Sequence, residues 1–467
     1  MALQAESETD GLPEASVRAL AARLRGEVVR RADDEYDQAR RVWNAIVDRR
    51  PALIVRPREV ADVIQTVDFA RTHDVPLAVR GGGHSPAGYG TVDDGLVVDL
   101  SSMKRLDVDP KRRVAAAEPG LTWGEYNART NQYGLATPGG DVPAVGVAGL
   151  TLGGGMGWLM RKHGMTIDNL LAVDVVSDDG RLLTASEAEH PDLFWALRGG
   201  GGNFGIATGL RYRLVPVGTV LGGAIVHAAT REGLRAYAEA TAAAPDELTT
   251  ITFVQKAPPL PFIPADAHGT PVHVILPCYT GDLDAGQRAL APLRRLAGHT
   301  PLADTTSPTP YPGLYDLTTM AAVSRPHTIR NAYLRELTNE TIELILDFVN
   351  RATSPFSLIA LRELGGAMAR VPVDATAFAH RDKAFYVAAD NSWEDEPRPE
   401  RHVAWAEAFS QAVAPYTDGA YASFLEDEGE DRVRTAYTPA TYARLAAIKR
   451  RYDPDNLFRL NPNIRPA

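Results

Sequence analysis

The chain has a single cysteine, Cys278, among its 467 residues. It can therefore make no internal disulfide and build no thiolate zinc or iron–sulfur site, and we expect no metal. No run of about 18 apolar residues occurs, which predicts no membrane span. The first residues, MALQAESETDGLPEAS, lack an apolar stretch of signal-peptide length, which predicts a cytoplasmic protein. There are 49 basic and 59 acidic residues, and the net charge of −10 argues against a nucleic-acid partner.

The length of the chain predicts more than one packed unit, because single cores rarely exceed about 200 residues. Hydrophobic residues make up 45% and charged residues 23%, which is the composition of a folded globular protein. Apolar residues recur at helical spacing over residues 13–31 and predict one helix there. Glycine is dense in the first 210 residues and thins after Pro216, so we expect a boundary near residue 216. What remains is a soluble, multidomain protein, and the expected class is an enzyme.

Three glycine clusters lie in the first half of the chain: residues 80–85 (RGGGHS), 145–157 (VGVAGLTLGGGMG) and 198–205 (RGGGGNFG). Glycine lets the backbone adopt positive φ and approach a ligand closely. Successive backbone N–H groups in such loops form concavities that bind anions, phosphates above all. For one cluster, tight turns in a β-rich domain would be sufficient. Three clusters beside apolar strands favour a long anionic cofactor.

Other cofactor and catalytic motifs fit the sequence less well. Residues 200–205 spell G-x-G-x-x-G, but here a predicted helix precedes the motif and a predicted strand follows it, the reverse of a nicotinamide-binding Rossmann site. No G-x-x-x-x-G-K-[ST] occurs, so no P-loop is indicated. Residues 83–87 nearly spell the G-x-S-x-G nucleophile elbow, but Ala87 replaces the last glycine, which disfavours a serine hydrolase.

Five motifs in order carry a family resemblance. They are RGGGHS; PGG followed by VGVAGLTLGGGMGWLMRKHG; DN at Asp168 and Asn169; PDLFWALRGGGGNFGI; and YDPDNLFR followed by NPNI. With them the chain, over residues 43–466, resembles the FAD-linked oxidases of the vanillyl-alcohol-oxidase superfamily, with a PCMH-type FAD-binding domain, and specifically the berberine-bridge-enzyme-like group.

The resemblance implies an α+β fold in three parts. Residues 1–215 would form the two-part FAD-binding domain, with a core at about 47–215. Residues 216–415 would form a substrate-binding domain, an antiparallel sheet covered by helices on one face. Residues 416–467 would form a C-terminal berberine-bridge-like segment that returns to the FAD domain.

The resemblance also implies the cofactor contacts. His84 would be bonded to the 8α position of FAD. Relatives with a second covalent link carry a cysteine where this chain has Val142, so we expect a single bond. The backbone of residues 81–85 would hold the pyrophosphate. The full set of implied cofactor-binding residues is Arg80, Gly81, Gly82, Gly83, His84, Ser85, Gly146, Gly149, Gly153, Gly154, Gly157, Gly205, Ile206, Asn461 and Asn463.

The catalytic residues are left open among four candidates. In relatives the proton acceptor is a tyrosine, glutamate or aspartate, and the tyrosine usual in sugar oxidases is replaced here by Phe424. Tyr421 and Glu363 are the leading candidates, followed by Tyr386 and Asp390. Each also has an ordinary explanation as a surface or hydrogen-bonded residue. The residues expected to line an apolar substrate pocket are Leu150, Met156, Phe253 and Phe424, although all four would also suit an ordinary core.

The function that this resemblance implies is an FAD-dependent oxidase. It would move a hydride from a small organic substrate, aromatic or polyketide-like, to flavin N5, with O2 as acceptor, and act in secondary metabolism. A dehydrogenase and a flavin-dependent oxygenase of the same fold are the alternatives. A flavin-binding protein without turnover is a third hypothesis, because Phe424 cannot take a proton.

Overall fold

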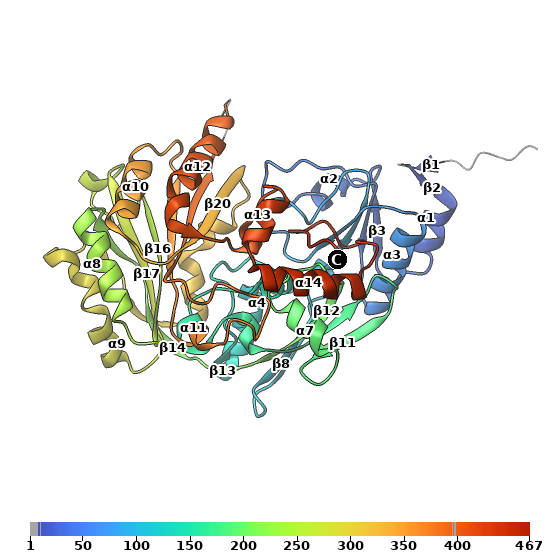
Figure 1. Ribbon diagram of the computed structural model, residues 1–467, viewed down its shortest axis with the longest axis horizontal. Helices are drawn as coiled ribbons and strands as arrows, with labels where there is room; N and C mark the ends of the chain where they lie inside the picture. The colour runs from blue at the N-terminus through green and yellow to red at the C-terminus, as the bar shows by residue number, and fades with distance from the viewer. Residues whose placement is uncertain (1–7, 10, 395, 397) are drawn as a thin grey trace, which may run out of the picture.

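The computed structural model describes residues 8–9, 11–394, 396 and 398–467. Three large sheets carry the fold (Figure 1), and strands and helices follow one another in the mixed order of an α+β protein. The predicted α+β class is confirmed. Among the described residues, no helix combines the length and the apolar character needed to cross a membrane.

The first sheet has four strands in the order β3-β4-β6-β5, and β4, β5 and β6 run parallel. The helix α3 connects β4 to β5, as a parallel crossover requires. This part comprises β1 (Glu8–Thr9), β2 (Leu12–Pro13), α1 (Glu14–Ala21), β3 (Glu27–Arg30), α2 (Tyr36–Ala39), β4 (Leu53–Arg56), α3 (Val60–Thr72), β5 (Leu77–Arg80), β6 (Leu96–Asp99) and the short 3-10 helix η1 (Leu100–Ser102).

One prediction in this region is wrong. The expected helix over residues 13–31 ends at Ala21, and Glu27–Arg30 forms the edge strand β3. Val28 pairs with Val55 of β4, and β-branched residues favour such a strand. Gly26 makes the turn possible, because a Cβ there would lie 2.1 Å from the carbonyl oxygen of Arg56.

The second sheet has five antiparallel strands in the order β11-β10-β12-β8-β7. The predicted order of helix, glycine cluster and strand over residues 191–213 is confirmed by α7 and β12. The elements are β7 (Leu106–Asp109), β8 (Val114–Ala117), α4 (Trp123–Thr130), η2 (Asn131–Tyr133), β9 (Leu135–Ala136), α5 (Val147–Gly153), α6 (Met160–His163), η3 (Thr166–Asn169), β10 (Leu170–Val176), β11 (Leu182–Ser186), α7 (Pro191–Leu197), β12 (Ile206–Arg213) and β13 (Val215–Pro216).

The third sheet has ten strands, and its pairings are antiparallel. Its strands are β14 (Thr219–Gly222), β15 (Ile225–Ala228), β16 (Leu248–Lys256), β17 (Pro271–Tyr279), β18 (Ala303–Asp304), β19 (Ser307–Pro310), β20 (His327–Leu334), β21 (Leu358–Glu363), β22 (Phe385–Ser392) and β23 (Thr417–Asp418). The predicted boundary near residue 216 falls between β12 of the second sheet and β14 of this one.

Helices cover one face of the third sheet, and Figure 1 shows them on the side away from the first two sheets. They are α8 (Arg231–Ala242), α9 (Leu283–Leu290), α10 (Asn339–Asn350) and α12 (Glu400–Val413). The opposite face meets residues of the second glycine cluster, such as Met156, and the tyrosine Tyr421. Short connections are η4 (Ala265–Ala267), η5 (Leu293–Gly298), η6 (Tyr311–Leu317), η7 (Thr319–Ala322), α11 (Ala367–Arg370), η8 (Ala414–Tyr416) and η9 (Ala422–Phe424).

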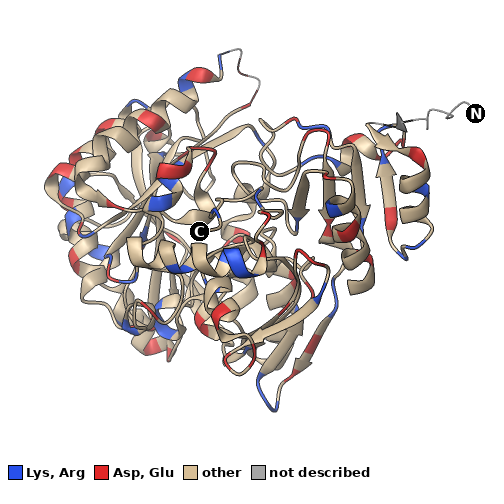
Figure 2. Ribbon diagram, turned by 45° about the vertical axis from the view of Figure 1, so that its right-hand side comes forward, with Lys and Arg blue, Asp and Glu red and all other residues tan. Residues whose placement is uncertain are grey.

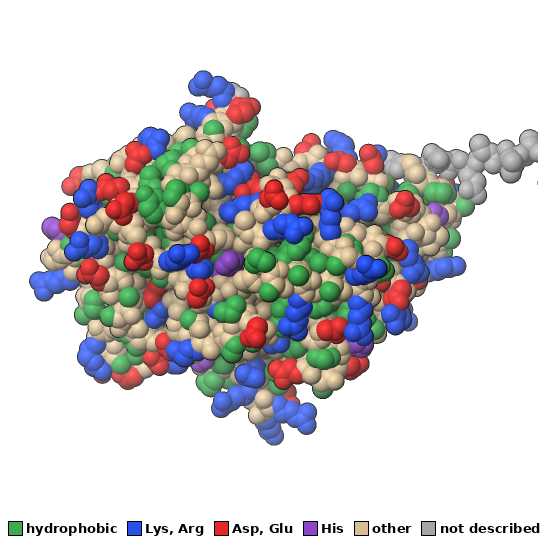
Figure 3. All heavy atoms as spheres, viewed as in Figure 1, with side chains coloured by type: hydrophobic (Ala, Val, Ile, Leu, Met, Phe, Trp, Pro, Cys, Tyr) green, Lys and Arg blue, Asp and Glu red, His purple; other side chains and the backbone are tan. Residues whose placement is uncertain are grey.

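The C-terminal segment, with α13 (Glu430–Thr435) and α14 (Pro439–Tyr452), returns to the N-terminal half. In Figure 1 it lies across the front of the second sheet, near α7. Thr438 caps α14 by accepting the N–H of Thr441, and Pro439 occupies the first helical position. Over the rest of the surface, acidic and basic side chains are interspersed (Figures 2 and 3).

Candidate functional site

The first glycine cluster forms one wall of a cavity of about 380 Å³. The loop begins at Arg80, the last residue of β5, whose buried guanidinium donates to Asp99 Oδ2 at 2.8 Å and to the carbonyl oxygen of Ala39 at 2.6 Å. These bonds anchor the start of the loop. The cavity is lined by Gln38, Ala39, Arg41, Val42, Trp43, Arg56, Arg80, Gly81, Gly82, Gly83, His84, Asp99, Ser101, Ala322 and Ser324.

The first two glycine clusters touch each other at Gly82 and Gly146. A Cβ on Gly82 would lie 2.4 Å from the backbone nitrogen of Gly146, so neither position tolerates a side chain without movement. At Gly149, three residues further on, a Cβ would meet no described atom within 4 Å. The contact therefore joins the two glycine-rich loops and leaves open space beside them, which suits an extended ligand.

Other glycines in the predicted cofactor set have packing reasons within the chain. A Cβ on Gly153 would meet Ser423, one on Gly154 would meet Met165 and Phe378, and one on Gly157 would lie 1.9 Å from the carbonyl oxygen of Gly139. Gly205 has φ +144° and packs against Val175 and Val176, and Ile206 is buried in the core of the first sheet. The structure accounts for these residues without a ligand, so their cofactor contacts stay predictions.

His84 lies at this cavity in an unusual environment. Burial and the nearby His327 lower its pKa to about 4. Its ring stacks on Trp43, with 5.2 Å between ring centroids, and Trp43 also packs on His327 at 4.4 Å. A neutral imidazole keeps a lone pair available for bonding. At neutral pH, His84 is therefore uncharged.

Asp390 lies at the His84 end of the site, where its carboxylate contacts His327. Its Oδ1 lies 3.1 Å from Nε2 of His327. Asn44 joins β20, which begins at His327, to the loop after His84, because its side chain donates to the carbonyl oxygens of Pro86 and His327. The structure therefore brings Asp390 to the His84 end and gives its carboxylate a partner away from Tyr421.

The C-terminal tail brings two asparagines to the site. Lys449 of α14 is fully buried, and its ammonium group donates to Asp453, to the carbonyl oxygen of Asn203 and to that of Phe458. This interaction fixes the tail to the third glycine cluster. Beyond it, the side-chain oxygens of Asn461 and Asn463 are buried and have no partner among the described residues. Unpartnered buried acceptors are rare and indicate a missing ligand, so the site fits a hydrogen-bond donating group such as a flavin ring.

Tyr421 occupies the interface between the second glycine cluster and the third sheet. Its hydroxyl oxygen accepts the N–H of Gly155 at 3.0 Å, and its own N–H donates to Asn331 Oδ1 at 2.7 Å. Burial raises the pKa of Tyr421, and the Ser423 side chain, the Gly155 N–H and the Arg362 guanidinium only partly oppose that rise. Tyr421 therefore holds its proton more tightly than a free phenol does, and its role as a proton acceptor stays a prediction.

The predicted apolar lining is only partly assembled. Met156, Phe253 and Phe424 join one apolar cluster with Tyr386 and Tyr421, and Phe424 lies 5.8 Å from Tyr386 between ring centroids. Leu150 instead packs in the core of the second sheet, against Gly140 and Gly155. Three of the four expected residues therefore surround the tyrosines.

Glu363 does not face this cluster. It shares the helix-covered face of β21 with Leu361, whereas Arg362 lies on the face turned to Tyr421. Its Oε1 accepts from Arg161 Nη1 at 2.5 Å, and burial raises its pKa to about 8 against the attraction of Arg161. Its carboxylate therefore links α6 to the third sheet and does not reach Tyr421.

Arg362 is the residue of this site that sequence reasoning missed. Its Nη1 lies 2.8 Å from Asp141 Oδ2, and both side chains are about nine-tenths buried. Asp141 immediately precedes Val142, the position of the absent cysteine. Alternation along a strand places neighbouring residues such as Arg362 and Glu363 on opposite faces, but it does not reveal which of the two faces Tyr421.

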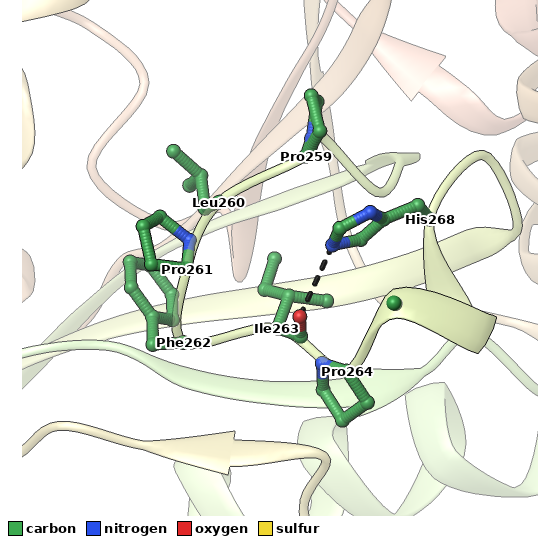
Figure 4. Close-up of a pocket in the computed structure, with 8 residues that line it drawn as sticks. Pro259, Leu260, Pro261, Phe262, Ile263, Pro264 and His268 are labelled. Atoms are coloured by element: carbon green, nitrogen blue, oxygen red, sulfur yellow. Dashed lines mark hydrogen bonds between the residues drawn. The ribbon is translucent and has the colours of Figure 1, made fainter.

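A second cavity, of about 490 Å³, lies in the loop after β16. Figure 4 shows His268 as its polar side chain, with a ring nitrogen 3.1 Å from the carbonyl oxygen of Ile263. The other lining residues are Pro259, Leu260, Pro261, Phe262, Ile263, Pro264 and Ala265. Because the other lining side chains are all apolar, this cavity lacks the several polar groups of an active site. No trio of His, Cys, Asp or Glu side chains in the described part of the chain is placed to hold a metal ion.

Comparisons with known proteins agree with this site. Residues 51–186 match the family described as FAD binding domain, and residues 420–465 match the family described as berberine and berberine like. An uncharacterized FAD-linked oxidoreductase of Bacillus subtilis (strain 168), YgaK, is 30% identical over 454 residues, covering 95% of this chain and 98% of that protein. The (R)-6-hydroxynicotine oxidase of Paenarthrobacter nicotinovorans is 31% identical over 460 residues, covering 95% and 97%.

Solved structures agree over nearly the whole length. The 6-hydroxy-D-nicotine oxidase of Arthrobacter nicotinovorans superposes with a TM-score of 0.84 at 28% identity, covering 95% of this chain and 98% of that one. The glucooligosaccharide oxidase of Acremonium strictum superposes with a TM-score of 0.86 at 25% identity, covering 97% and 99%, and is described with a 6-S-cysteinyl, 8α-N1-histidyl FAD.

Proposed function

The chain belongs to the FAD-linked oxidoreductases with a berberine-like C-terminal segment, as its motifs indicated, and from this premise we propose that it is an oxidase that holds FAD through one covalent bond to His84. Its substrate in this proposal is a small, largely apolar organic molecule. The observation that carries the proposal is His84 itself, a neutral imidazole on a glycine loop at the wall of a cavity.

The cofactor-holding groups come from three parts of the chain. His84 supplies the covalent bond, the backbone of residues 81–85 receives the phosphates, and Asn461 and Asn463 offer acceptors from the tail. Val142 cannot form a sulfur link, which limits the attachment to one bond. Bound FAD would supply the electron acceptor, which takes a hydride from the substrate and passes the electron pair to O2 as hydrogen peroxide.

Tyr421 is the proton acceptor in this proposal. Its ring lies among the apolar residues Met156 and Phe424, and the Ser423 side chain, the Gly155 N–H and the Arg362 guanidinium offset part of the rise in its pKa that burial causes. Tyr386 lies beside it, 6.4 Å away between ring centroids, and its hydroxyl has no described partner. Tyr386 therefore serves better as a substrate contact than as a base. The placements of Glu363 and Asp390 do not support a proton-transfer role.

The proposal is tested on the purified protein by absorbance, first native and then after acid precipitation. Flavin bands that stay in the pellet support the covalent link, and flavin released into the supernatant would refute it. The variant His84→Ala should keep the fold and lose the acid-stable flavin. Substrate candidates are then screened for peroxide.

The same preparation distinguishes three alternative functions. Flavin that is reduced by substrate but reoxidised slowly by air indicates a dehydrogenase, and incorporation of labelled oxygen into product indicates an oxygenase. Flavin that no substrate reduces under anaerobic conditions indicates a binding protein without turnover, which the loss of tyrosine at Phe424 favours. A cytoplasmic location and a role in secondary metabolism stay predictions.

A further inference from the structure

Three polar side chains form a row near one end of three neighbouring strands of the third sheet. Tyr386 of β22 pairs directly with Arg362 of β21 on one side and with Tyr333 of β20 on the other. Directly paired residues lie on the same face of a sheet. The row is on the face that carries Tyr421 and Met156, opposite the covering helices.

These side chains are buried with unused hydrogen-bonding capacity. The hydroxyls of Tyr333 and Tyr386 and the Nε of Arg362 have no partner among the described residues. The two tyrosines are at most 1% exposed, and Arg362 is 8% exposed. The side-chain nitrogen of Asn331, in the next row of the sheet, is likewise unpartnered. Buried polar groups are nearly always hydrogen-bonded, so a group of neighbouring exceptions on one face of the sheet points to a ligand.

The unpartnered groups share one chemical property. Arg362 Nε and the Asn331 amide nitrogen are donors only, and each tyrosine hydroxyl can donate. The Asp141 carboxylate is already paired with Arg362, and Asp390, the other anion that acts on Tyr386, lies 3.1 Å from His327. A polyol would bring hydroxyl protons that need acceptors. This row instead suits an oxygen with lone pairs and no proton.

The side chains that cluster around the row are mostly apolar. The next row of the sheet pairs Ala388 with Ala360, the smallest side chains of the cluster, and Phe253 lies beside them. Methionines and Phe378 from other segments complete the cluster. A ligand whose oxygen binds the polar row can therefore bury an apolar body against these residues.

We propose that Arg362, Tyr386 and Tyr333 bind a carboxylate or carbonyl oxygen of the substrate and so select an aromatic or aliphatic acid or ketone over a sugar. The proposal rests on the proposed function, because it takes this cluster as the substrate side of the flavin site. Tyr421 lies next to the row and receives the proton from the molecule that the row positions.

The test is a titration of the FAD-loaded protein with three probes: benzoate, acetophenone and benzyl alcohol. Binding is followed by the flavin difference spectrum and by calorimetry. Benzoate and acetophenone should bind more tightly than benzyl alcohol. Tyr386→Phe and Tyr333→Phe should each weaken benzoate binding roughly tenfold, because each removes one hydrogen bond to a charged oxygen. Neither change removes a bond within the protein, so the melting temperature should not fall.

Two further variants control the experiment. Tyr36→Phe makes the same change at a hydroxyl that donates to the carbonyl oxygen of Pro51 in the first sheet, and it should leave benzoate binding unchanged. Arg362→Met combined with Asp141→Asn removes the guanidinium without leaving its carboxylate partner charged, and it should abolish the preference for benzoate.

The proposal would be overturned if Tyr386→Phe and Tyr333→Phe both left the benzoate affinity unchanged. It would also be overturned if the wild type bound benzyl alcohol more tightly than benzoate. A preparation without flavin bands would instead refute the proposed function. In that case calorimetry on the same protein still decides whether the row binds benzoate.

Discussion

Removal of the Lys449 ammonium group should loosen the tail that carries Asn461 and Asn463. Lys449 is 0% exposed, and its three N–H groups are all used, by Asp453 Oδ2 at 2.5 Å and by the carbonyl oxygens of Asn203 at 2.6 Å and Phe458 at 2.9 Å. Lys449→Met keeps much of the apolar volume and removes these bonds. The Asp453 carboxylate then stays buried, with the N–H groups of residues 457 and 458 as its remaining partners.

The magnitude follows from the uncompensated charge. Removing one partner of a buried ion pair costs about 3–5 kcal/mol, and the two carbonyl oxygens also lose their donor. We expect a loss of about 4 kcal/mol in the free energy of unfolding, which for a chain of this length lowers the melting temperature by roughly 5 °C. Exposure of the tail should also increase the fluorescence of the bound flavin.

The assay is thermal unfolding followed by circular dichroism, with flavin fluorescence on the same samples. Lys449→Met combined with Asp453→Asn removes the stranded charge and should recover about half of the lost stability. Lys104→Met is the surface control: its pair with Glu125 is exposed and contributes about 0–1 kcal/mol. A melting temperature of Lys449→Met within about 1 °C of the wild type, or a double variant no more stable than the single one, would refute the reasoning.

Three further predictions concern the site. Covalent attachment of FAD to the apoprotein should proceed at pH 5.5 as fast as at pH 7.5, because the lowered pKa of about 4 keeps His84 neutral; a histidine of ordinary pKa would react about tenfold more slowly at pH 5.5, which in-gel flavin fluorescence would detect. Tyr421→Phe should lower kcat by about 10²–10⁴, and because burial raises the pKa of Tyr421, wild-type kcat should rise toward alkaline pH; a flat profile contradicts the assignment. Glu363→Gln should leave kcat within about twofold but lower the melting temperature by a few degrees above about pH 8, where the Glu363 carboxyl is ionised and Arg161 loses its buried charged partner; a large loss of kcat with no loss of stability would reverse this view.

Much of the cofactor half could be predicted because its signals are local. A glycine cluster restricts the nearby backbone whatever packs around it, and Gly83, Gly154 and Gly205 all have the positive φ that glycine permits. The order of helix, loop and strand around residues 198–205 was likewise readable from neighbouring residues. The helix predicted over residues 13–31 failed because Val28 pairs with Val55, a partner that periodicity alone does not reveal.

The substrate half was less predictable because its side chains depend on strand register. Alternation separates Arg362 from Glu363 but does not say which one meets Tyr421 and which one meets Arg161. Asp390 was a candidate base until the fold placed it 3.1 Å from His327, a residue 63 positions earlier on the neighbouring strand β20.

The sequence by itself determined the family, the FAD-binding class of the first half and the absence of a cysteine at Val142, because these depend on residue identity and short-range order. Only the tertiary structure decided that His84 lies near His327 at the wall of a cavity, that Glu363 turns away from the site, and that Arg362, Tyr386 and Tyr333 stand in one row with donors unused. Those features arise from pairings between strands distant in the chain, and burial and hydrogen bonding at such positions exist only after the sheet has formed.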